Sequence, residues 1–196
     1  MNAIEKLLET TLELATVSLS QALQDWNVQV GFMAKLGEGV ALIARTNDAV
    51  DARIRDDTHV HVATRVEHAA RGEFELLFPM AGARQLLCAA LCLPGDEDGD
   101  LTQGMDEMEI DALHEMMNLL CGSVNSVYGD YDLRLSQNVE DLQVKQREGG
   151  PDVDLRGVVV VFPLELEGAG SHQLVQVLPL PTALAMARAI ETRQAA

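Results

Sequence analysis

The chain has 196 residues, of which 47% are hydrophobic and 4% aromatic, and its formal net charge is -17. This charge argues against nucleic acid and anionic membrane surfaces as partners, because both repel an acidic protein. No apolar run reaches the roughly 18 residues that a transmembrane helix needs. The lack of such a run and the odd number of cysteines predict a cytoplasmic protein. The length predicts a single domain over residues 1–196.

The first half of the chain mixes helical and strand patterns. Helices are predicted where apolar residues recur every three to four positions, and strands where apolar and polar residues alternate. The predicted elements are, in chain order, a helix at 3–26, strands at 28–35 and 39–46 around a turn at Gly37–Gly39, a loop at 48–57, strands at 59–66 and 74–78, and a helix at 80–91.

The second half repeats this order more loosely. Its predicted elements are a helix at 107–127 capped by Thr102 or Asp106, a strand at 133–139, a charged linker at 145–154, strands at 158–162 and 174–178, and a helix opened by Pro181. We therefore predict an α+β fold with a largely antiparallel sheet and long helices packed on one face. A long helix followed by strands occurs from residue 3 and again from residue 107, which hints at an internal duplication.

Two segments have residues that could bind a metal, but an ordinary loop and an ordinary strand are preferred. The acidic run Asp96–Asp100 has the spacing of a calcium loop, yet Leu101 occupies the position where the turn needs glycine, so a solvated loop is preferred. His59 and His61 share one face of a strand without a third ligand, and an exposed strand face is the preferred interpretation. We predict that no metal or cofactor is intrinsic to the fold.

The cysteines are typical of core packing. Cys88 and Cys92 lie one turn apart on the apolar helix 80–91 and its end, where buried small hydrophobic residues are the preferred interpretation and redox chemistry is the alternative. The pattern contains no glycine-rich phosphate loop, serine nucleophile elbow or CxxC pair.

The predicted helix at 107–127 has two unlike faces. Its apolar face carries Leu113, Met116, Met117, Leu120, Val124 and Val127. Its polar face carries Asp111, Glu115, Asn118, Gly122 and Asn125. Asn and Gly are poor helix formers, and Gly costs roughly 1 kcal/mol relative to Ala. Their presence on one exposed face indicates a surface kept for contact, although an ordinary solvated face is the alternative.

The stretch Asp111-xxx-Glu115-xx-Asn118, followed by Leu-Leu-Cys-Gly122, resembles the motif of the CheC/CheX/FliY phosphatases, most closely that of CheX-like chemotaxis proteins. The predicted order of elements around the motif is similar to that family over most of the chain. Two features differ. No proline occurs between Pro94 and Pro151, where the family usually has one. The N-terminal helix offers only Glu9, Glu13 and Thr16 at the matching spacing, which implies one site per chain.

The resemblance implies a chemotaxis protein that dephosphorylates a CheY-like response regulator. By this analogy Asn118 orients the attacking water, Glu115 pairs with a lysine of the regulator, and Asp111 and Gly122 contact the partner. The phosphorylated partner would supply Mg²⁺, and the chain would form a homodimer. A non-catalytic module that binds a response regulator or the flagellar switch is the main alternative. A purely structural dimer is a further one.

Overall fold

The computed structural model describes residues 2–44, 58–92, 106–136, 142–146, 157–167 and 170–195. Its helices are α1 (Ala3–Val30), α3 (Met80–Leu91), α4 (Glu107–Tyr128) and α5 (Leu180–Gln194), with a short 3-10 turn at Gly129–Tyr131. Its strands are β1 (Ala34–Leu36), β2 (Val40–Ala44), β3 (Thr58–His68), β4 (Gly72–Pro79), β5 (Leu133–Ser136), β6 (Leu142–Gln146), β7 (Gly157–Leu166) and β8 (Gly170–Pro179).

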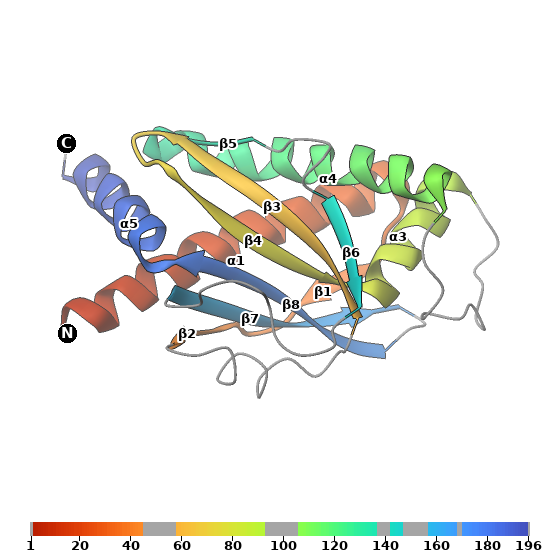
Figure 1. The fold of residues 1–196 in the computed structure, drawn as a ribbon, viewed down its shortest axis with the longest axis horizontal. Coiled ribbons are helices and arrows are strands. Elements are labelled where there is room, and N and C mark those ends of the chain that lie inside the picture. Colours follow the sequence, from red (N-terminus) through yellow and green to blue (C-terminus); the bar gives the residue numbers. More distant parts are fainter. Residues whose placement is uncertain are drawn as a thin grey trace.

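The described strands form one antiparallel sheet whose long central strands run β7-β8-β4-β3 (Figure 1). At one edge β1 and β2 pair with successive parts of β7. At the other edge β5 and β6 pair with successive parts of β3. The two edges are therefore built alike, each from two short strands along one long strand.

The internal duplication is visible in this topology. The order helix, four strands, helix runs from α1 to α3 and again from α4 to α5. The halves exchange their short strands, because β1 and β2 pair with β7, whereas β5 and β6 pair with β3. They meet at the centre through β4 and β8, where Leu76 lies opposite Gln176.

The described helices cover one face of the sheet, as the sequence predicted. α1 and α4 lie side by side and run in opposite directions, with α3 and α5 at the two ends of the layer (Figure 1). Residues from all four helices join one hydrophobic core with inward-facing strand residues such as Val62, Phe78 and Val160. A smaller cluster around Leu77, Val159 and Val175 lies on the opposite face of the sheet.

Several predicted boundaries were wrong. The strand predicted at 28–35 starts too early, because α1 continues to Val30 and ends at Gly31, which adopts a left-handed conformation with φ of 72°. The linker predicted from residue 145 overlaps β6, which ends at Gln146. The predicted loop at 48–57 and the acidic run Asp96–Asp100 lie outside the described residues.

Candidate functional site

The helix α4 begins with a well-formed cap. The Asp106 carboxylate accepts a hydrogen bond from the Glu109 backbone N–H at 2.8 Å, and the Glu109 carboxylate accepts one from the Asp106 N–H at 2.8 Å. Reciprocal bonds of this kind satisfy amide groups that have no partner within the helix. Asp106 is thus the capping residue among the two candidates, and Thr102 lies outside the described residues.

The predicted division of α4 into two faces is confirmed for the motif residues. Leu113, Met117 and Leu120 are buried, with exposed fractions of 0%, 1% and 5%. The four residues assigned to the site, Asp111, Glu115, Asn118 and Gly122, are all exposed on the other side of the same helix. Burial of the apolar face therefore holds the polar face toward solvent.

The exposed motif residues are available for a partner. Within the described part of the chain, the Glu115 and Asn118 side chains make no hydrogen bond or ion pair. On an ideal helix Asn118 lies about 4.5 Å beyond Glu115 along the axis, so both side chains can reach one small target. A Cβ placed on Gly122 would meet nothing within 4 Å. Nothing in the described fold requires a glycine at this position.

A tryptophan from the other long helix anchors this turn from beneath. The indole N–H of Trp26, on α1, donates to the backbone carbonyl of Met116 at 3.2 Å, between Glu115 and Asn118. Trp26 is fully buried and packs edge-on against Phe32 and Phe78, each with ring centroids 5.7 Å away. This positioning role was not predicted from the sequence, where its signal was the single tryptophan of the chain at the buried end of α1.

The placement of Asn125 on the exposed polar face was wrong. This residue is half-buried, and its amide donates to the Leu135 carbonyl at 2.9 Å and accepts from the Leu135 N–H at 2.6 Å. Asn125 thus binds α4 to β5 through both backbone groups of one strand residue. This pairing holds β5 against the last turns of α4.

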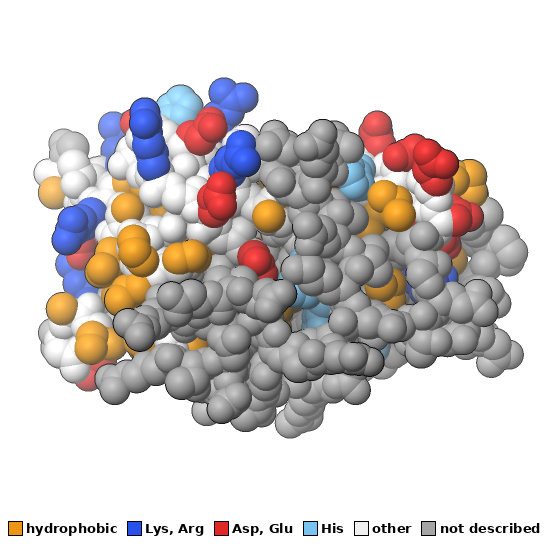
Figure 2. Space-filling model, in the orientation of Figure 1, with side chains coloured by type: hydrophobic (Ala, Val, Ile, Leu, Met, Phe, Trp, Pro, Cys, Tyr) orange, Lys and Arg blue, Asp and Glu red, His pale blue; other side chains and the backbone are white. Residues whose placement is uncertain are grey.

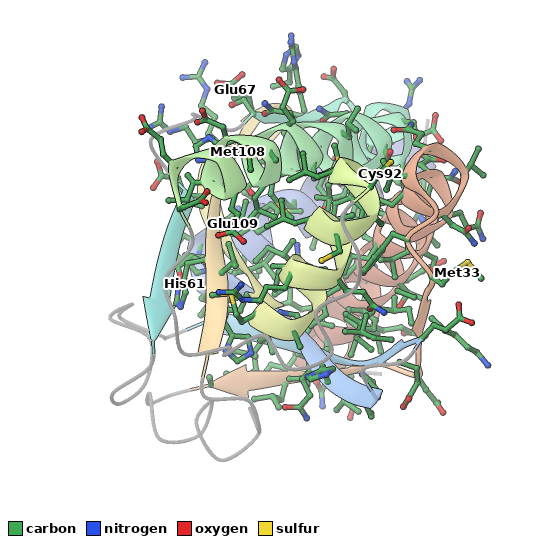
Figure 3. All side chains as sticks on the ribbon, turned by 90° about the vertical axis from the view of Figure 1, so that its right-hand side faces the viewer. Met33, His61, Glu67, Cys92, Met108 and Glu109 are labelled. Carbon is green, nitrogen blue, oxygen red and sulfur yellow. The ribbon has the colours of Figure 1, made fainter. Side chains whose placement is uncertain are left out.

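The exposed side of α4 is strongly acidic. Figure 3 looks at the end of the molecule where α4 begins, with Met108 and Glu109 on its first turn. Glu109 lies 3.7 Å from Arg84 of α3, so its charge is partly compensated. Glu107, Asp111 and Glu115 follow each other at four-residue spacing along one edge of the helix, which we call the acidic edge. Met108 and Leu119 are exposed beside it, at 60% and 37%.

The corresponding helix α1 has no asparagine at the position equivalent to Asn118. A shift of 102 residues places six buried residues of α1, between Thr11 and Trp26, on buried residues of α4, between Leu113 and Tyr128. Leu14 and Leu23 fall instead on the half-buried Met116 and Asn125. The same shift places Thr16 at the position of Asn118. The Thr16 hydroxyl donates to the Leu12 carbonyl at 2.7 Å, so its proton is bound within α1.

Two ionisable groups on the buried face of α4 have strongly shifted pKa values. Burial raises the pKa of Cys121 to about 12 and that of Tyr128 to about 12. Hydrogen bonding of the Tyr128 side chain with Gln176 and Ser18 lowers the pKa and so partly opposes the effect of burial. Both groups stay neutral at physiological pH, so neither is an acid, base or nucleophile for the exposed site.

The other candidate residues are arranged differently from the prediction. His59 and His61 are buried, at 1% and 9%, and not on an exposed strand face. The His61 Nδ1 lies 3.4 Å from a carboxylate oxygen of Glu75 on β4 (Figure 3 marks His61). Cys88 is half-buried, and Cys92 is exposed because it ends α3 in a left-handed conformation.

Metal binding finds no support in the described ranges, where no group of three or more His, Cys, Asp or Glu residues is placed to hold an ion. The absence of an intrinsic cofactor stays a prediction. None of the described helices has the length and apolar character that a membrane crossing demands.

Structural comparison identifies the fold. In sequence, no family model and no curated protein matches the chain. FliY from Thermotoga maritima superposes with a TM-score of 0.69 at 16% identity, covering 99% of both chains. FliM from H. pylori, in complex with SpeE, gives 0.71 at 9% identity, covering 99% of this chain and 98% of the other. CheX from Desulfovibrio desulfuricans gives 0.55 at 14% identity, covering 85% of this chain and 99% of the other. The chain therefore has the CheC/CheX/FliY fold, as the resemblance implied.

Proposed function

We propose that this chain acts in chemotaxis signalling and dephosphorylates a CheY-like response regulator. One observation carries the proposal: Glu115 and Asn118 lie one turn apart on the exposed face of a helix, and neither is engaged elsewhere in the described fold. Both side chains are therefore free to contact a partner. These two stand on a helix fixed by a buried apolar face and by the Trp26–Met116 hydrogen bond.

The chemistry needs little more than positioning. An aspartyl phosphate is hydrolysed by a water that attacks the phosphorus in line with the bond to the aspartate. The amide of Asn118 would hold this water, since an amide can both donate and accept a hydrogen bond. The phosphorylated regulator would supply Mg²⁺ and a lysine that neutralise the developing charge. Positioning can lower a barrier by several kcal/mol, up to roughly 7–11 kcal/mol in ideal cases.

The remaining motif residues would dock the regulator. Glu115 would pair with the lysine of the regulator and so fix the position of the Asn118 amide relative to the phosphoryl group. Asp111 would flank this contact one turn earlier, and the open surface over Gly122 would accept the partner backbone. Leu119, exposed beside Asn118, offers apolar area at the centre of the contact. We also propose that the chain forms homodimers, as the resemblance to CheX-like proteins implies.

The direct test is release of phosphate from a phosphorylated CheY-like receiver. Asn118→Ala should reduce the acceleration by about 100-fold or more, because the attacking water loses its orientation. Its affinity for a receiver carrying a stable phosphoryl mimic should change little. Glu115→Ala should weaken both rate and affinity, because the ion pair sets the docking as well as the water geometry.

Gln194→Ala is the matched control, because Gln194 is an exposed amide on α5, at the end of the helix layer away from α3 and the start of α4 (Figure 1). Its rate and affinity should equal those of the wild type. Equal phosphate lifetimes with and without the wild-type protein would eliminate the catalytic proposal.

A non-catalytic binding module is the second candidate. It is favoured by the similarity over 99% of this chain to FliM, a protein whose structure was determined in complex with SpeE. On this alternative the acidic edge would dock a protein partner without hydrolysis. Wild-type binding to the receiver, with no change in phosphate lifetime, would support this second function over the first.

A further inference from the structure

A small cavity lies in the core where α5 packs against α1 and the sheet. The residues that line it include Thr10 and Thr11 of α1, Tyr128 of α4, Gln176 of β8 and Ala187 of α5. The cavity is nearly enclosed, and about 10 Å³ of it is open to the centre of a water molecule. α5 forms one end of the molecule (left in Figure 1), where Figure 2 shows apolar and basic side chains at the surface. Outside the cavity, Lys6 of α1 binds Glu191 of α5 at 2.7 Å. The cavity therefore has room for a water molecule and for little else.

The buried side chains beside the cavity form a chain of hydrogen bonds whose direction is fixed by Ser18. The Ser18 hydroxyl has a single proton and donates it to the Ala15 carbonyl at 3.2 Å. Tyr128 hydrogen-bonds with Ser18 and Gln176, so its hydroxyl donates to Ser18 and accepts from the Gln176 amide N–H. The other end of this amide, the oxygen Oε1 of Gln176, is shielded from solvent and has no hydrogen-bond partner among the described residues.

Thr11 brings a second oxygen to the cavity that can only accept a hydrogen bond. Its hydroxyl proton is already donated to the Leu7 carbonyl at 2.8 Å. Thr11 and Gln176 are both buried, with exposed fractions of 7% and 4%. A buried acceptor without a donor is unfavourable, and an apolar group in the cavity would satisfy neither oxygen. A water molecule has two protons to donate, one for each of these acceptors.

We propose that this cavity is the binding site of one water molecule that belongs permanently to the core and donates hydrogen bonds to Gln176 Oε1 and Thr11 Oγ1. The Thr10 hydroxyl, which makes no hydrogen bond within the described residues, is available to donate to the water oxygen. The water then joins β8 to α1 beneath α5. Polar contacts therefore attach α1 to the second half of the fold toward both of its ends, because Trp26 binds the Met116 carbonyl at the other one.

Oxygen-17 relaxation dispersion of the full chain tests the proposal, because it counts the water molecules that exchange much more slowly than surface water. Thr11→Val keeps the shape of the side chain and removes its oxygen, so the variant should lose the signal of about one slow water molecule. Gln176→Leu, which removes the other acceptor, should lose the same signal. Thr16→Val is the matched control and should keep it, because the Thr16 hydroxyl also donates to the carbonyl four residues earlier but does not line the cavity.

Filling the cavity is a second test, which decides the question even if Gln176→Leu does not fold. Ala187→Val adds methyl groups at the cavity wall, so it should displace the water and leave Gln176 Oε1 without a donor. Its urea midpoint of unfolding should fall below that of Ala185→Val, the same change at a half-buried alanine of α5 outside the cavity.

Two results would overturn the proposal. One is a slow-water signal that survives in both Thr11→Val and Gln176→Leu. The other is an Ala187→Val protein as stable as Ala185→Val or more stable, because a dry cavity gains from being filled. None of these measurements uses a response regulator, so their outcome is independent of the proposed function.

Discussion

The two long helices share most of their buried positions and differ on the side turned away from the core. On α4 the exposed face has Glu115, Asn118 and Gly122; on α1 the positions 102 residues earlier have Glu13, Thr16 and Ser20. An exposed aliphatic residue follows in both, Leu119 at 37% and Val17 at 51%. At these matched positions both helices have an acid and an aliphatic residue, whereas only α4 has the asparagine and the glycine.

The difference shows that the two helices have different tasks: α1 stabilises the turn that carries the motif, and α4 exposes the motif side chains. α1 holds its Thr16 hydroxyl within its own backbone and contributes the Trp26 indole to the turn that carries the motif. α4 leaves its amide unbonded and uses a second amide, Asn125, to fix the next strand. Two copies of one helix can therefore serve as anchor and as candidate site.

Removing the anchor should have the largest effect. Trp26→Ala empties a fully buried aromatic position between two phenylalanines and should lower the free energy of unfolding by about 3–5 kcal/mol. Trp26→Phe keeps much of the packing but loses the bond to Met116, so it should cost about 1 kcal/mol. Urea unfolding measures both. A Trp26→Ala protein as stable as the wild type would contradict the anchoring role of α1.

Transferring the site to α1 should have an intermediate effect. In an Asn118→Ala background, Thr16→Asn with Ser20→Gly should restore about tenfold in phosphate release, equivalent to ~1.4 kcal/mol of barrier. The physical reason is that α1 already presents an acid one turn earlier. Thr16→Ala with Ser20→Gly in the same background is the control and should restore nothing. Equal rates for the two would show that the faces differ by more than the amide.

Replacing Gly122 by alanine should affect stability and partner binding in opposite directions. Gly122→Ala should raise the free energy of unfolding by roughly 0.5–1 kcal/mol, because the Cβ meets no atom and alanine is the better helix former. The same methyl should weaken binding of a receiver that approaches the helix closely. Ser20→Ala on α1 should affect stability slightly and binding not at all. Unchanged binding by Gly122→Ala would remove Gly122 from the contact.

The smallest effect concerns the thiols. At pH 8, with the protein folded, Cys92 should react with a thiol reagent, while Cys121 should not, because burial raises its pKa to about 12. Unfolded Cys121 ionises near pH 9, so the protein binds more protons folded than unfolded between pH 9 and 12. Stability should therefore fall as pH rises through this range. Fast labelling of Cys121 in the folded protein would contradict the orientation of α4.

Periodic segments were predictable from sequence, and the contacts between them were not. The helix Met80–Leu91 matched its prediction, and Leu113, Met117 and Leu120 were buried as their spacing required. Asn125 was assigned to the wrong face because its partner, the backbone of Leu135, is brought to it by the fold and leaves no trace in helical spacing.

Contacts between elements also explain why the predictions for the two histidines and for the end of α1 were wrong. His59 and His61 alternate with apolar residues, which is typical of a half-exposed strand, but in the structure both side chains are buried. Val28 and Val30 suggested a strand because β-branched residues favour one, yet the first left-handed position is Gly31, and the helix continues up to it.

The exchange of short strands between the halves has a consequence during synthesis on the ribosome. β1 and β2 leave the ribosome long before β7, the strand with which they pair, and β4 must wait for β8. Until the last strands emerge, the first half would display unsatisfied strand edges and an uncovered apolar surface, a state prone to aggregation. We expect neither half to be stable when expressed alone, and non-local pairing of this kind slows folding. We therefore expect the chain to mature as one unit, and a premature stop in its second half to lose the whole fold.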